Sequence, residues 1–508
     1  MTTTAHTILE LLAAGADDAT AISAPGRMPL TYGALRTFLG DTLEVLRSIG
    51  TKRNDRIAIV QPNKPEMAVS FLAAAAGCAA APLNPAYRAD EFEFYLTDLD
   101  ARLLIVEAEK ASPAIEVAHR LGVPVAQLAP NQAGPAGSFT LTTGNGRRSP
   151  TAAGPAGPED IALVLHTSGT TSRPKIVPLS QHNVCASARN VRTTLELGPA
   201  DRGLNVMPLF HIHGLIAGLL APLSAGGEVF CTPGFDALHF FRWMEEAHPT
   251  WYTAVPTMHQ TIVARAGRHA NVIRANPLRF IRSSSSALPP QVIGELEATF
   301  NAPVIESYGM TEAAHQMASN PLPPGARKPG SVGIAAGPEV AIMDADGKLL
   351  RPGKPGEIVI RGPNVTAGYQ NNPKANGEAF TNGWFRTGDQ GVMDDDGYIS
   401  ITGRLKEIIN RGGEKISPRE VDEVLMDHPA VRQVVTFAVP HAKLGEDVAA
   451  AVVLRDGASA TERELREFAG KRLAPFKVPR TILFLDEIPK GATGKLQRIG
   501  LAQKLGLA

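Results

Sequence analysis

Short apolar segments alternate with longer amphipathic segments along most of the chain. Buried strands are predicted at residues 56–60, 80–82 and 103–106, with a helix at 64–76 between the first two. Strands that alternate with helices are typical of an α/β layer whose sheet is largely parallel. The alternation of strands and helices continues further along the chain, where we predict strands at residues 123–125, 161–165, 202–207, 227–232, 251–255, 278–283 and 304–307.

Other segments depart from this alternation of strands and helices. Residues 10–50 predict helices with one turn at Pro25 and Gly26, and the Pro-, Gly-, Ala-, Ser- and Thr-rich residues 130–157 predict a loop. Short β-rich pieces interrupted by Gly, Pro and Asn indicate a small β-subdomain, with strands at 339–343, 357–361 and 397–402. The last part of the chain predicts a compact α+β unit, with elements at 418–428, 431–439, 447–454 and 461–473.

The length of the chain also indicates more than one domain. Its 508 residues exceed what one hydrophobic core usually serves. We therefore predict an α/β fold with a large layered N-terminal domain over residues 1–403, which includes the β-subdomain. A hinge at 404–410 and a small mobile α+β domain at 411–508 complete the expected organisation.

Composition narrows the class of protein. Lys plus Arg equals Asp plus Glu, at 50 each, so the whole-chain charge gives no sign of a nucleic-acid partner. Three widely spaced cysteines predict neither a disulfide scaffold nor a zinc site. The N-terminus shows no secretory signal, and the apolar runs at 68–83 and 206–223 make poor membrane spans. We expect a cytoplasmic protein.

Hydroxyl-bearing residues crowd the stretch that follows the strand at 161–165. Residues 166–175 read HTSGTTSRPK. Glycine lets the backbone approach a ligand closely, hydroxyl and N–H groups surround phosphate oxygens, and a cation balances their charge. A Ser/Thr-rich surface turn is the alternative, and the glycine spacing is not that of a Walker loop. The pattern favours a phosphate-binding loop.

Two acidic motifs follow predicted strands. Residues 308–312 read YGMTE, and Mg²⁺ prefers one or two carboxylates together with phosphate oxygens. The alternative is a helix start with a threonine cap and an acidic first turn. Asp389, in the stretch FRTGD, could accept hydrogen bonds from both ribose hydroxyls, whereas an Asx turn is the alternative.

Two further motifs combine glycines with basic residues. Residues 403–415 read GRLKEIINRGGEK, and the paired glycines allow either a hinge, a close backbone approach or an ordinary flexible linker. Residues 489–495 read PKGATGK and end in Lys495 on a glycine-flanked turn. An ammonium group there could meet negative charge that develops in a transition state, although most lysines are simply solvated.

Taken in this order, the motifs resemble those of the adenylate-forming superfamily of acyl-CoA synthetases, luciferases and peptide-synthetase adenylation domains. The resemblance runs from about residue 10 to the end, through HTSGTTSRPK, PLFH, YGMTE, WFRTGD, GRLKEIINRGGEKISP and PKGATGKLQR. It implies a ligase that uses ATP and Mg²⁺ to turn a carboxylate into an acyl-adenylate, which the thiol of coenzyme A then attacks. The C-terminal domain would rotate between these half-reactions.

The resemblance also implies a role for each matching residue. Thr311 would bind the α-phosphate side, Glu312 would position Mg²⁺, and Lys495 would contact the carboxylate and α-phosphate during adenylation. Lys406 would be the hinge, and His211 would be the gate beside the acyl pocket. ATP would contact Thr167, Ser168, Gly169, Thr170, Thr171, Ser172, Lys175 and Tyr308, with its ribose on Asp389 and Arg404, and the thiol channel would be lined by Gly412 and Gly413. Ser172 and Ile176 stand where the family usually has glycine.

The expected acyl pocket is polar. It offers His211, His213, the run RSSSSA at 282–287, and His315, whereas a fatty-acyl tunnel should have glycines and aliphatic residues. Such donors suit a short, doubly charged acid. Longer stretches, including PLNPAYRADEFEFYLTD, PLFHIHGLIAGLL and MTEAAHQMASNPLP, resemble the oxalyl-CoA synthetase group. That resemblance implies that Ser285, His315 and His211 hold the distal carboxylate of oxalate.

Several alternatives stay open. The serine run could merely frame adenine while His213 and His315 pack elsewhere, and the acid could be malonate or a short- or medium-chain fatty acid. Two further alternatives belong to other classes of protein. One is an adenylation module that loads a carrier protein, and the other is a nucleotide-binding regulator without catalytic activity. The sequence does not indicate an oligomeric state.

Overall fold

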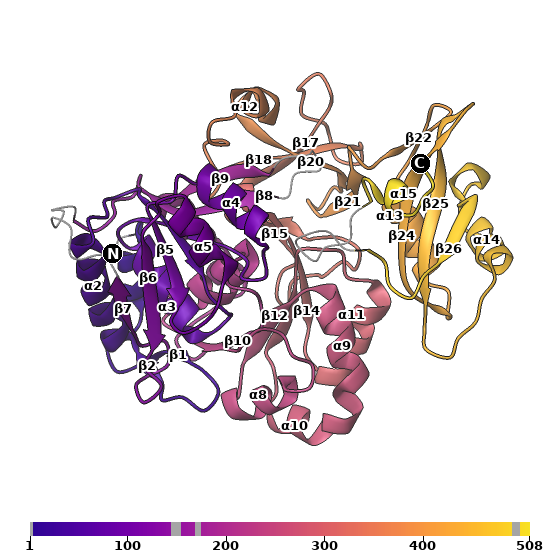
Figure 1. Ribbon diagram of the computed structural model, residues 1–508. Coiled ribbons are helices and arrows are strands. Elements are labelled where there is room, and N and C mark those ends of the chain that lie inside the picture. The colour runs from indigo at the N-terminus through magenta and orange to yellow at the C-terminus, as the bar shows by residue number, and fades with distance from the viewer. Residues whose placement is uncertain (1–3, 144–153, 168–173, 490–497) are drawn as a thin grey trace. The chain divides into compact units, whose positions relative to one another are not determined.

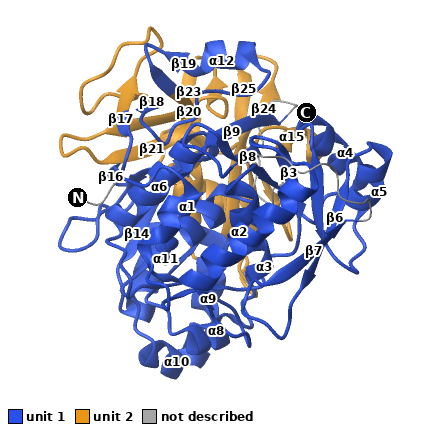
Figure 2. Ribbon diagram, turned by 90° about the vertical axis from the view of Figure 1, so that its left-hand side faces the viewer, with its two compact units in different colours: residues 1–167, 174–340, 360–385 blue, residues 168–173, 341–359, 386–508 orange. Residues whose placement is uncertain are grey.

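The computed structural model describes residues 4–143, 154–167, 174–489 and 498–508 (Figure 1). The described residues form two compact units (Figure 2). Unit 1 comprises residues up to 167 together with 174–340 and 360–385, and unit 2 comprises 341–359 and the residues from 386 to the C-terminus. The predicted α/β class is confirmed, while the predicted domain boundaries remain a prediction.

Unit 1 contains a nine-stranded sheet whose central strands are parallel. Its strands are β1 (Thr20–Ser23), β2 (Leu30–Thr31), β10 (Arg202–Asn205), β11 (Glu228–Cys231), β12 (Trp251–Ala254), β13 (Phe280–Ser283), β14 (Val304–Met310), β15 (His315–Ser319) and β16 (Ile334–Ala335). They lie in the order β16-β15-β14-β13-β12-β10-β11-β1-β2. The run from β14 to β1 is parallel, and β2, β15 and β16 pair antiparallel at the two edges.

Both faces of this sheet are buried, which explains its continuous apolar strands. On β12, Tyr252 and Ala254 join one core, whereas Trp251, which directly precedes Tyr252, joins the other. The first core packs against α8 (Phe240–Ala247), α9 (Pro256–Ala266), α10 (Ala270–Ala275) and α11 (Pro290–Phe300) (Figure 1). The second packs against α6 (Gln181–Thr194), the π-helix η2 (His213–Leu220) and α7 (Ala221–Leu223).

A seven-stranded sheet completes the core of unit 1. It has the order β7-β6-β5-β3-β4-β8-β9, with β3 (Arg56–Val60), β4 (Ala79–Pro82), β5 (Leu103–Glu107), β6 (Val125–Pro130), β7 (Phe139–Thr143), β8 (Ile161–Thr167) and β9 (Lys175–Ser180). Residues of α4 (Ala89–Asp98) and α5 (Pro113–Arg120) share a core with alternate residues of β3, β4 and β5. The remaining helices of unit 1 are α1 (Ile8–Leu11), α2 (Tyr32–Ser48), α3 (Pro65–Ala75) and α12 (Pro373–Ala379).

Two local predictions were wrong. Residues 10–50 are not helical throughout, because β1 pairs in parallel with β11 and β2 pairs with β1. The predicted loop at 130–157 contains β7, which adds an antiparallel edge to β6. In both places pairing with a distant or neighbouring strand decided the conformation.

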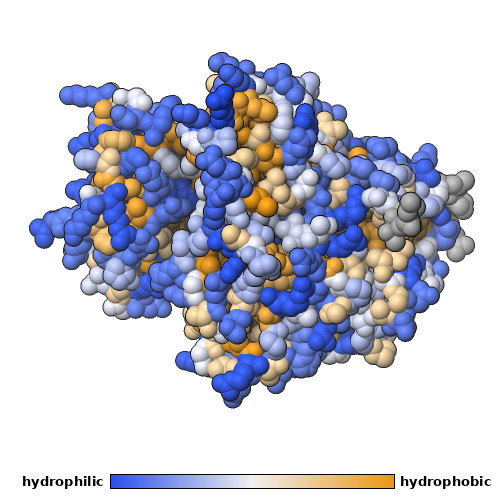
Figure 3. Space-filling model, turned by 180° about the vertical axis from the view of Figure 1, so that it is seen from behind, coloured by the Kyte–Doolittle hydropathy of each residue, from blue (hydrophilic) through white to orange (hydrophobic). Residues whose placement is uncertain are grey.

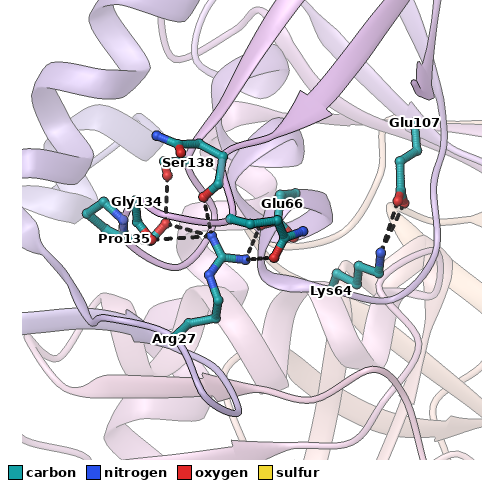
Figure 4. Close-up of polar contacts among 9 residues, drawn as sticks. Arg27, Lys64, Glu66, Glu107, Gly134, Pro135 and Ser138 are labelled. Atoms are coloured by element: carbon teal, nitrogen blue, oxygen red, sulfur yellow. Dashed lines mark hydrogen bonds and ion pairs between the residues drawn. The ribbon is translucent and has the colours of Figure 1, made fainter. Parts of the chain in front are cut away.

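A half-buried arginine, Arg27, fixes the start of that second segment against α3 (Figure 4). The Arg27 Nη1 donates to Glu66 Oε1 at 2.9 Å, and its Nη2 donates to the carbonyl oxygens of Asn131 and Pro135 at 2.8 and 3.2 Å. Lys64, at the N-cap of α3, pairs with Glu107 at the end of β5 at 3.0 Å. These contacts hold the strand connections of the seven-stranded sheet in place.

The β-subdomain and the C-terminal α+β elements follow the predicted pattern. A five-stranded sheet comprises β17 (Glu339–Met343), β18 (Gly356–Arg361), β19 (Phe380–Thr381), β20 (Trp384–Met393) and β21 (Ile399–Arg404). The C-terminal sheet has the order β23-β22-β25-β24, with β26 beside β25. Its strands and helices are β22 (Ile409–Arg411), β23 (Glu414–Ile416), α13 (Pro418–Met426), β24 (Val431–His441), β25 (Gly445–Leu454), α14 (Glu462–Gly470), β26 (Thr481–Phe484) and α15 (Leu501–Lys504).

On the face seen in Figure 3, hydrophilic side chains predominate and hydrophobic ones form small patches between them. Among the described residues, we find no helix that is both long enough and apolar enough to cross a bilayer.

Candidate active site

The two described ends of the predicted phosphate loop face each other in unit 1. Thr167 ends β8, Lys175 begins β9, and the two residues are partners across the antiparallel ladder. Ser168, Gly169, Thr170, Thr171 and Ser172 lie outside the described residues. Ile176, one of the two departures from the family pattern, buries its side chain in the core shared with α4 and α5, so β9 itself accommodates it.

Glu312 lies in a single 3₁₀ turn, Thr311–Ala313, directly after β14. The Tyr369 hydroxyl donates to Glu312 Oε1 at 2.8 Å, and both side chains are buried. Lys175 Nζ lies 4.3 Å from the centroid of the Tyr369 ring. Burial and the neighbouring carboxylate raise the pKa of Tyr369, so its hydroxyl stays protonated and donates. Tyr369 thus contacts two residues that the sequence assigned to the nucleotide.

The segment that carries Tyr369 joins β9 to the turn at Glu312. The Thr366 N–H donates to the Glu312 carbonyl oxygen at 2.7 Å, and the Thr366 hydroxyl donates to the Pro178 carbonyl oxygen at 2.8 Å. The Gln370 N–H donates to the carbonyl oxygen of Ile176 at 3.1 Å. The alternative in which Thr311 caps a helix is not observed, because Met310 occupies the cap position without a side-chain bond.

Asp389 and Arg404 are cross-strand partners in unit 2. They face each other in the β20–β21 register, and Arg404 Nε lies 3.1 Å from Asp389 Oδ1. The preceding turn is held by buried Glu357, which accepts the Gly388 N–H at 2.8 Å and pairs with Arg386 at 2.6 Å. The two residues predicted to bind ribose therefore come together, on two paired strands.

The paired glycines form the turn of a hairpin. Gly412 and Gly413 connect β22 to β23 with φ angles of +60° and +97°, which L residues rarely adopt. The Gly412 N–H donates to the carbonyl oxygen of Leu444 at 2.9 Å. Lys406 is exposed between β21 and β22, and Lys495 lies outside the described residues.

Arg282, on β13, is fully buried in unit 1 and contacts only neutral groups. Its side chain has no exposed surface, and it forms no ion pair with a carboxylate of the described residues. Its contacts are Nη1 with His213 Nε2 (3.3 Å) and Thr253 Oγ1 (3.4 Å), and Nη2 with His315 Nε2 (3.0 Å) and Gln316 Oε1 (3.3 Å). Burial lowers the pKa of Arg282 to about 9, which still leaves the guanidinium positive at neutral pH.

Two histidines and a serine surround this cation. The rings of His213 and His315 stack with centroids 5.0 Å apart, and His213 Nδ1 lies 3.1 Å from Ser285 Oγ. Ser285 and His315 have φ angles of +73° and +104°, a strained conformation that usually persists only where the surroundings impose it. Gly309 is required beside them, since a Cβ there would lie 1.8 Å from the His315 carbonyl oxygen.

The cluster lies where ligands bind in such sheets. Thr253 is near the carboxyl end of β12, Arg282 near that of β13, and Ser285 just beyond it. A buried positive charge beside neutral hydrogen-bond donors can hold a small anion, particularly one with two negative charges.

The positions of the other predicted residues say less about the chemistry of the site. His211 is half-buried before η2, with its ring 4.6 Å from that of Phe210, and Tyr308 is buried on β14. Cys78, Cys185 and Cys231 are all buried, and burial raises their pKa values to about 11, 12 and 12. They are therefore thiols rather than thiolates at neutral pH.

Sequence reasoning missed Tyr369 as a site residue, and it placed His213 and Arg282 in the expected acyl pocket without giving either residue a role of its own. One signal for Arg282 was present in the sequence, because it lies within a predicted apolar strand. Charged residues are rarely buried in such strands unless they have a partner or a function. Tyr369 carried no such signal, because its contact to Glu312 joins residues 57 positions apart.

The chain is similar to known proteins over most of its length. Residues 9–370 match the family model "AMP-binding enzyme", and residues 420–495 match "AMP-binding enzyme C-terminal domain". An oxalate–CoA ligase of Arabidopsis thaliana is 46% identical over 98% of this chain and 97% of its own length. An oxalate–CoA ligase of Saccharomyces cerevisiae is 43% identical over 89% and 87%. The ATP-bound crystal structure of MatB from Rhodopseudomonas palustris superposes with a TM-score of 0.88, at 30% identity over 98% of both chains.

Proposed function

The chain belongs to the AMP-binding enzyme family, and on that premise we propose that it is an ATP- and Mg²⁺-dependent acid–CoA ligase whose acid is oxalate. The reaction would join oxalate to coenzyme A through an oxalyl-adenylate. The two oxalate–CoA ligases that align with most of the chain support the choice of acid.

One observation carries the choice, namely the buried and uncompensated charge of Arg282. Removing a cation from water costs several kcal/mol, and good geometry together with an opposite charge is needed to offset this cost. The described residues provide Arg282 with neutral acceptors only. A substrate with a second carboxylate would bring the missing negative charge, whereas a fatty acid would bring none. Discrimination against monoanionic acids follows from that difference.

The chemistry requires the enzyme to bring two anions together. An oxalate oxygen attacks the α-phosphorus of ATP, an O–P bond forms, and the bond to pyrophosphate breaks. Lys175 and the loop after Thr167 would hold the leaving phosphates, and Thr311 would contact the α-phosphate. Asp389 and Arg404 would bind the ribose hydroxyls.

The residues present fit a metal carried by the nucleotide. Among the described residues no group of three or more His, Cys, Asp or Glu could hold a metal ion, whereas Glu312 offers one buried carboxylate oriented by Tyr369. Mg²⁺ typically takes one or two carboxylates and completes its shell with phosphate oxygens and water. When bound, it would spread the charge of the transferring phosphorus.

The second half-reaction needs no residue that forms a covalent bond. The thiol of coenzyme A would attack the activated carbonyl carbon and release AMP, with the Gly412–Gly413 turn lining the thiol path and Lys406 as the pivot. Lys495 would serve the first half-reaction only, so the two steps can be separated by mutation.

Activity with a panel of acids tests the proposal. The purified protein is incubated with ATP, Mg²⁺ and CoA plus oxalate, malonate, butyrate or octanoate, and AMP release is measured. We expect oxalate to give the highest kcat/KM with free CoA as acceptor. No AMP release with oxalate but turnover with butyrate or octanoate would reject oxalate. Failure of labelled pyrophosphate to exchange into ATP with every acid would reject the ligase itself.

A further inference from the structure

The hydrogen-bond roles in the Arg282 cluster are fixed by chemistry. A guanidinium group donates from every nitrogen and accepts at none. Arg282 Nη2 lies 3.0 Å from His315 Nε2, so this ring nitrogen must be the acceptor. A neutral imidazole with an accepting Nε2 carries its hydrogen on Nδ1.

The same reasoning extends to His213. Its Nε2 lies 3.3 Å from Arg282 Nη1 and 2.6 Å from the Thr253 hydroxyl. An N–H at Nε2 would face the guanidinium donor, so Nε2 accepts and Thr253 donates to it. The hydrogen of His213 is then on Nδ1 and is donated to Ser285 Oγ at 3.1 Å. Because Ser285 Oγ accepts this bond, its own hydroxyl hydrogen is left for another acceptor.

We propose that Arg282 is a positioning residue for acid specificity, which sets the tautomers of His213 and His315 so that His315 Nδ1–H and the Ser285 hydroxyl donate to the anionic substrate. The proposal rests on the proposed function for the identity of that substrate. It goes beyond simple charge balance, because one buried cation determines how two neutral rings and a hydroxyl direct their hydrogens.

The surroundings make this arrangement rigid. Gln316, which accepts from Arg282 at 3.3 Å, donates in turn to Thr194 Oγ1 and to the Ala336 carbonyl oxygen at 3.0 and 3.2 Å. His213 begins the π-helix η2, a rare element that often occurs at functional sites. Donors held in this way need no reorientation when an anion arrives, which increases their contribution to selectivity.

The tautomers can be measured without any substrate. Two-bond ¹H–¹⁵N spectra of ¹⁵N-histidine-labelled, ligand-free enzyme distinguish Nδ1–H from Nε2–H, and spectra of His213→Gln and His315→Gln identify the two rings. We expect both rings as Nδ1–H in the wild type. In Arg282→Met, a change of similar length without the charge, we expect His315 to shift toward Nε2–H.

Steady-state kinetics of matched variants give a second test of the proposal. Arg282→Met should lower kcat/KM for oxalate on the order of a hundredfold, as expected for the loss of charge-assisted hydrogen bonds, while the KM for ATP stays unchanged. Arg282→Lys, which still only donates, should keep the Nδ1–H form of His315 and recover part of the oxalate activity. Arg279→Met is the control, because Arg279 lies three residues earlier and pairs with Asp201 instead.

The outcomes separate the two proposals. An Nε2–H form of His315 in the wild type, or unchanged tautomers and oxalate kinetics in Arg282→Met, overturns the positioning role. If Arg282→Met does not fold, Arg282→Lys decides: loss of the Nδ1–H form there overturns the role, and its retention supports it. If the wild type shows Arg282-dependent Nδ1–H tautomers but no activity with oxalate, the proposed substrate fails while the tautomer assignment stands.

Discussion

Removing one hydroxyl group tests how Glu312 is held. Tyr369→Phe deletes the donor that lies 2.8 Å from Glu312 Oε1 and keeps the ring that contacts Lys175. Tyr369 and Glu312 are only 8% and 6% exposed, so water cannot easily replace the lost donor. A hydrogen bond to a charged group contributes about 1.5–3 kcal/mol. We expect the free energy of unfolding to fall by about that amount.

A second tyrosine provides the matched control. The Tyr32 hydroxyl is also buried, but it donates to the carbonyl oxygens of Gly227 and Leu223 at 2.7 and 3.1 Å. Bonds between neutral groups contribute about 0.5–1.5 kcal/mol. Tyr32→Phe should therefore cost less stability and leave nucleotide binding unchanged. Tyr369→Phe should also raise the Mg²⁺ concentration for half-maximal activity by about tenfold or more, because an oriented carboxylate has lost its support.

Two measurements check this expectation. Urea unfolding followed by circular dichroism gives the change in free energy for both variants, and Mg²⁺ titration of ATP–pyrophosphate exchange gives the metal dependence. Equal stability losses in the two variants, together with an unchanged Mg²⁺ dependence in Tyr369→Phe, would refute the role assigned to the Tyr369–Glu312 contact.

Three other substitutions probe separate parts of the site. His315→Ala should reduce kcat/KM for oxalate on the order of a hundredfold while ATP binding, measured by calorimetry, persists; an equal loss of both would move His315 out of the acid pocket. Lys495→Ala should lose adenylation by on the order of a hundredfold or more and still convert synthetic oxalyl-adenylate to the thioester; survival of both half-reactions would contradict its role. Gly309→Ala should lower the free energy of unfolding by about 1–3 kcal/mol, since its Cβ would overlap the His315 carbonyl oxygen, and wild-type stability in urea would show that the paired strands can relax.

Local pattern predicted most of the strands that build the site. The strands β3, β12 and β13 were predicted within a few residues, because both faces of these strands are covered and their sequences are largely apolar. The strand β1 was missed since its four residues, TAIS, are stabilised by parallel pairing with β11, about two hundred positions later. β7 was missed although its alternating FTLTT sequence, rich in β-branched residues, carried a signal.

The sequence by itself determined the order of the motifs, the layered α/β class and the presence of hydroxyls, carboxylates and histidines suited to a nucleotide and a small acid. Only the tertiary structure brought together Arg282, His213 and His315. These residues belong to three different elements and lie up to 102 positions apart in the sequence. It also decided that Arg282 is buried without a carboxylate. Hydrogen-bond direction and desolvation depend on distances in space, and a periodic sequence pattern specifies only which face of its own element a side chain occupies.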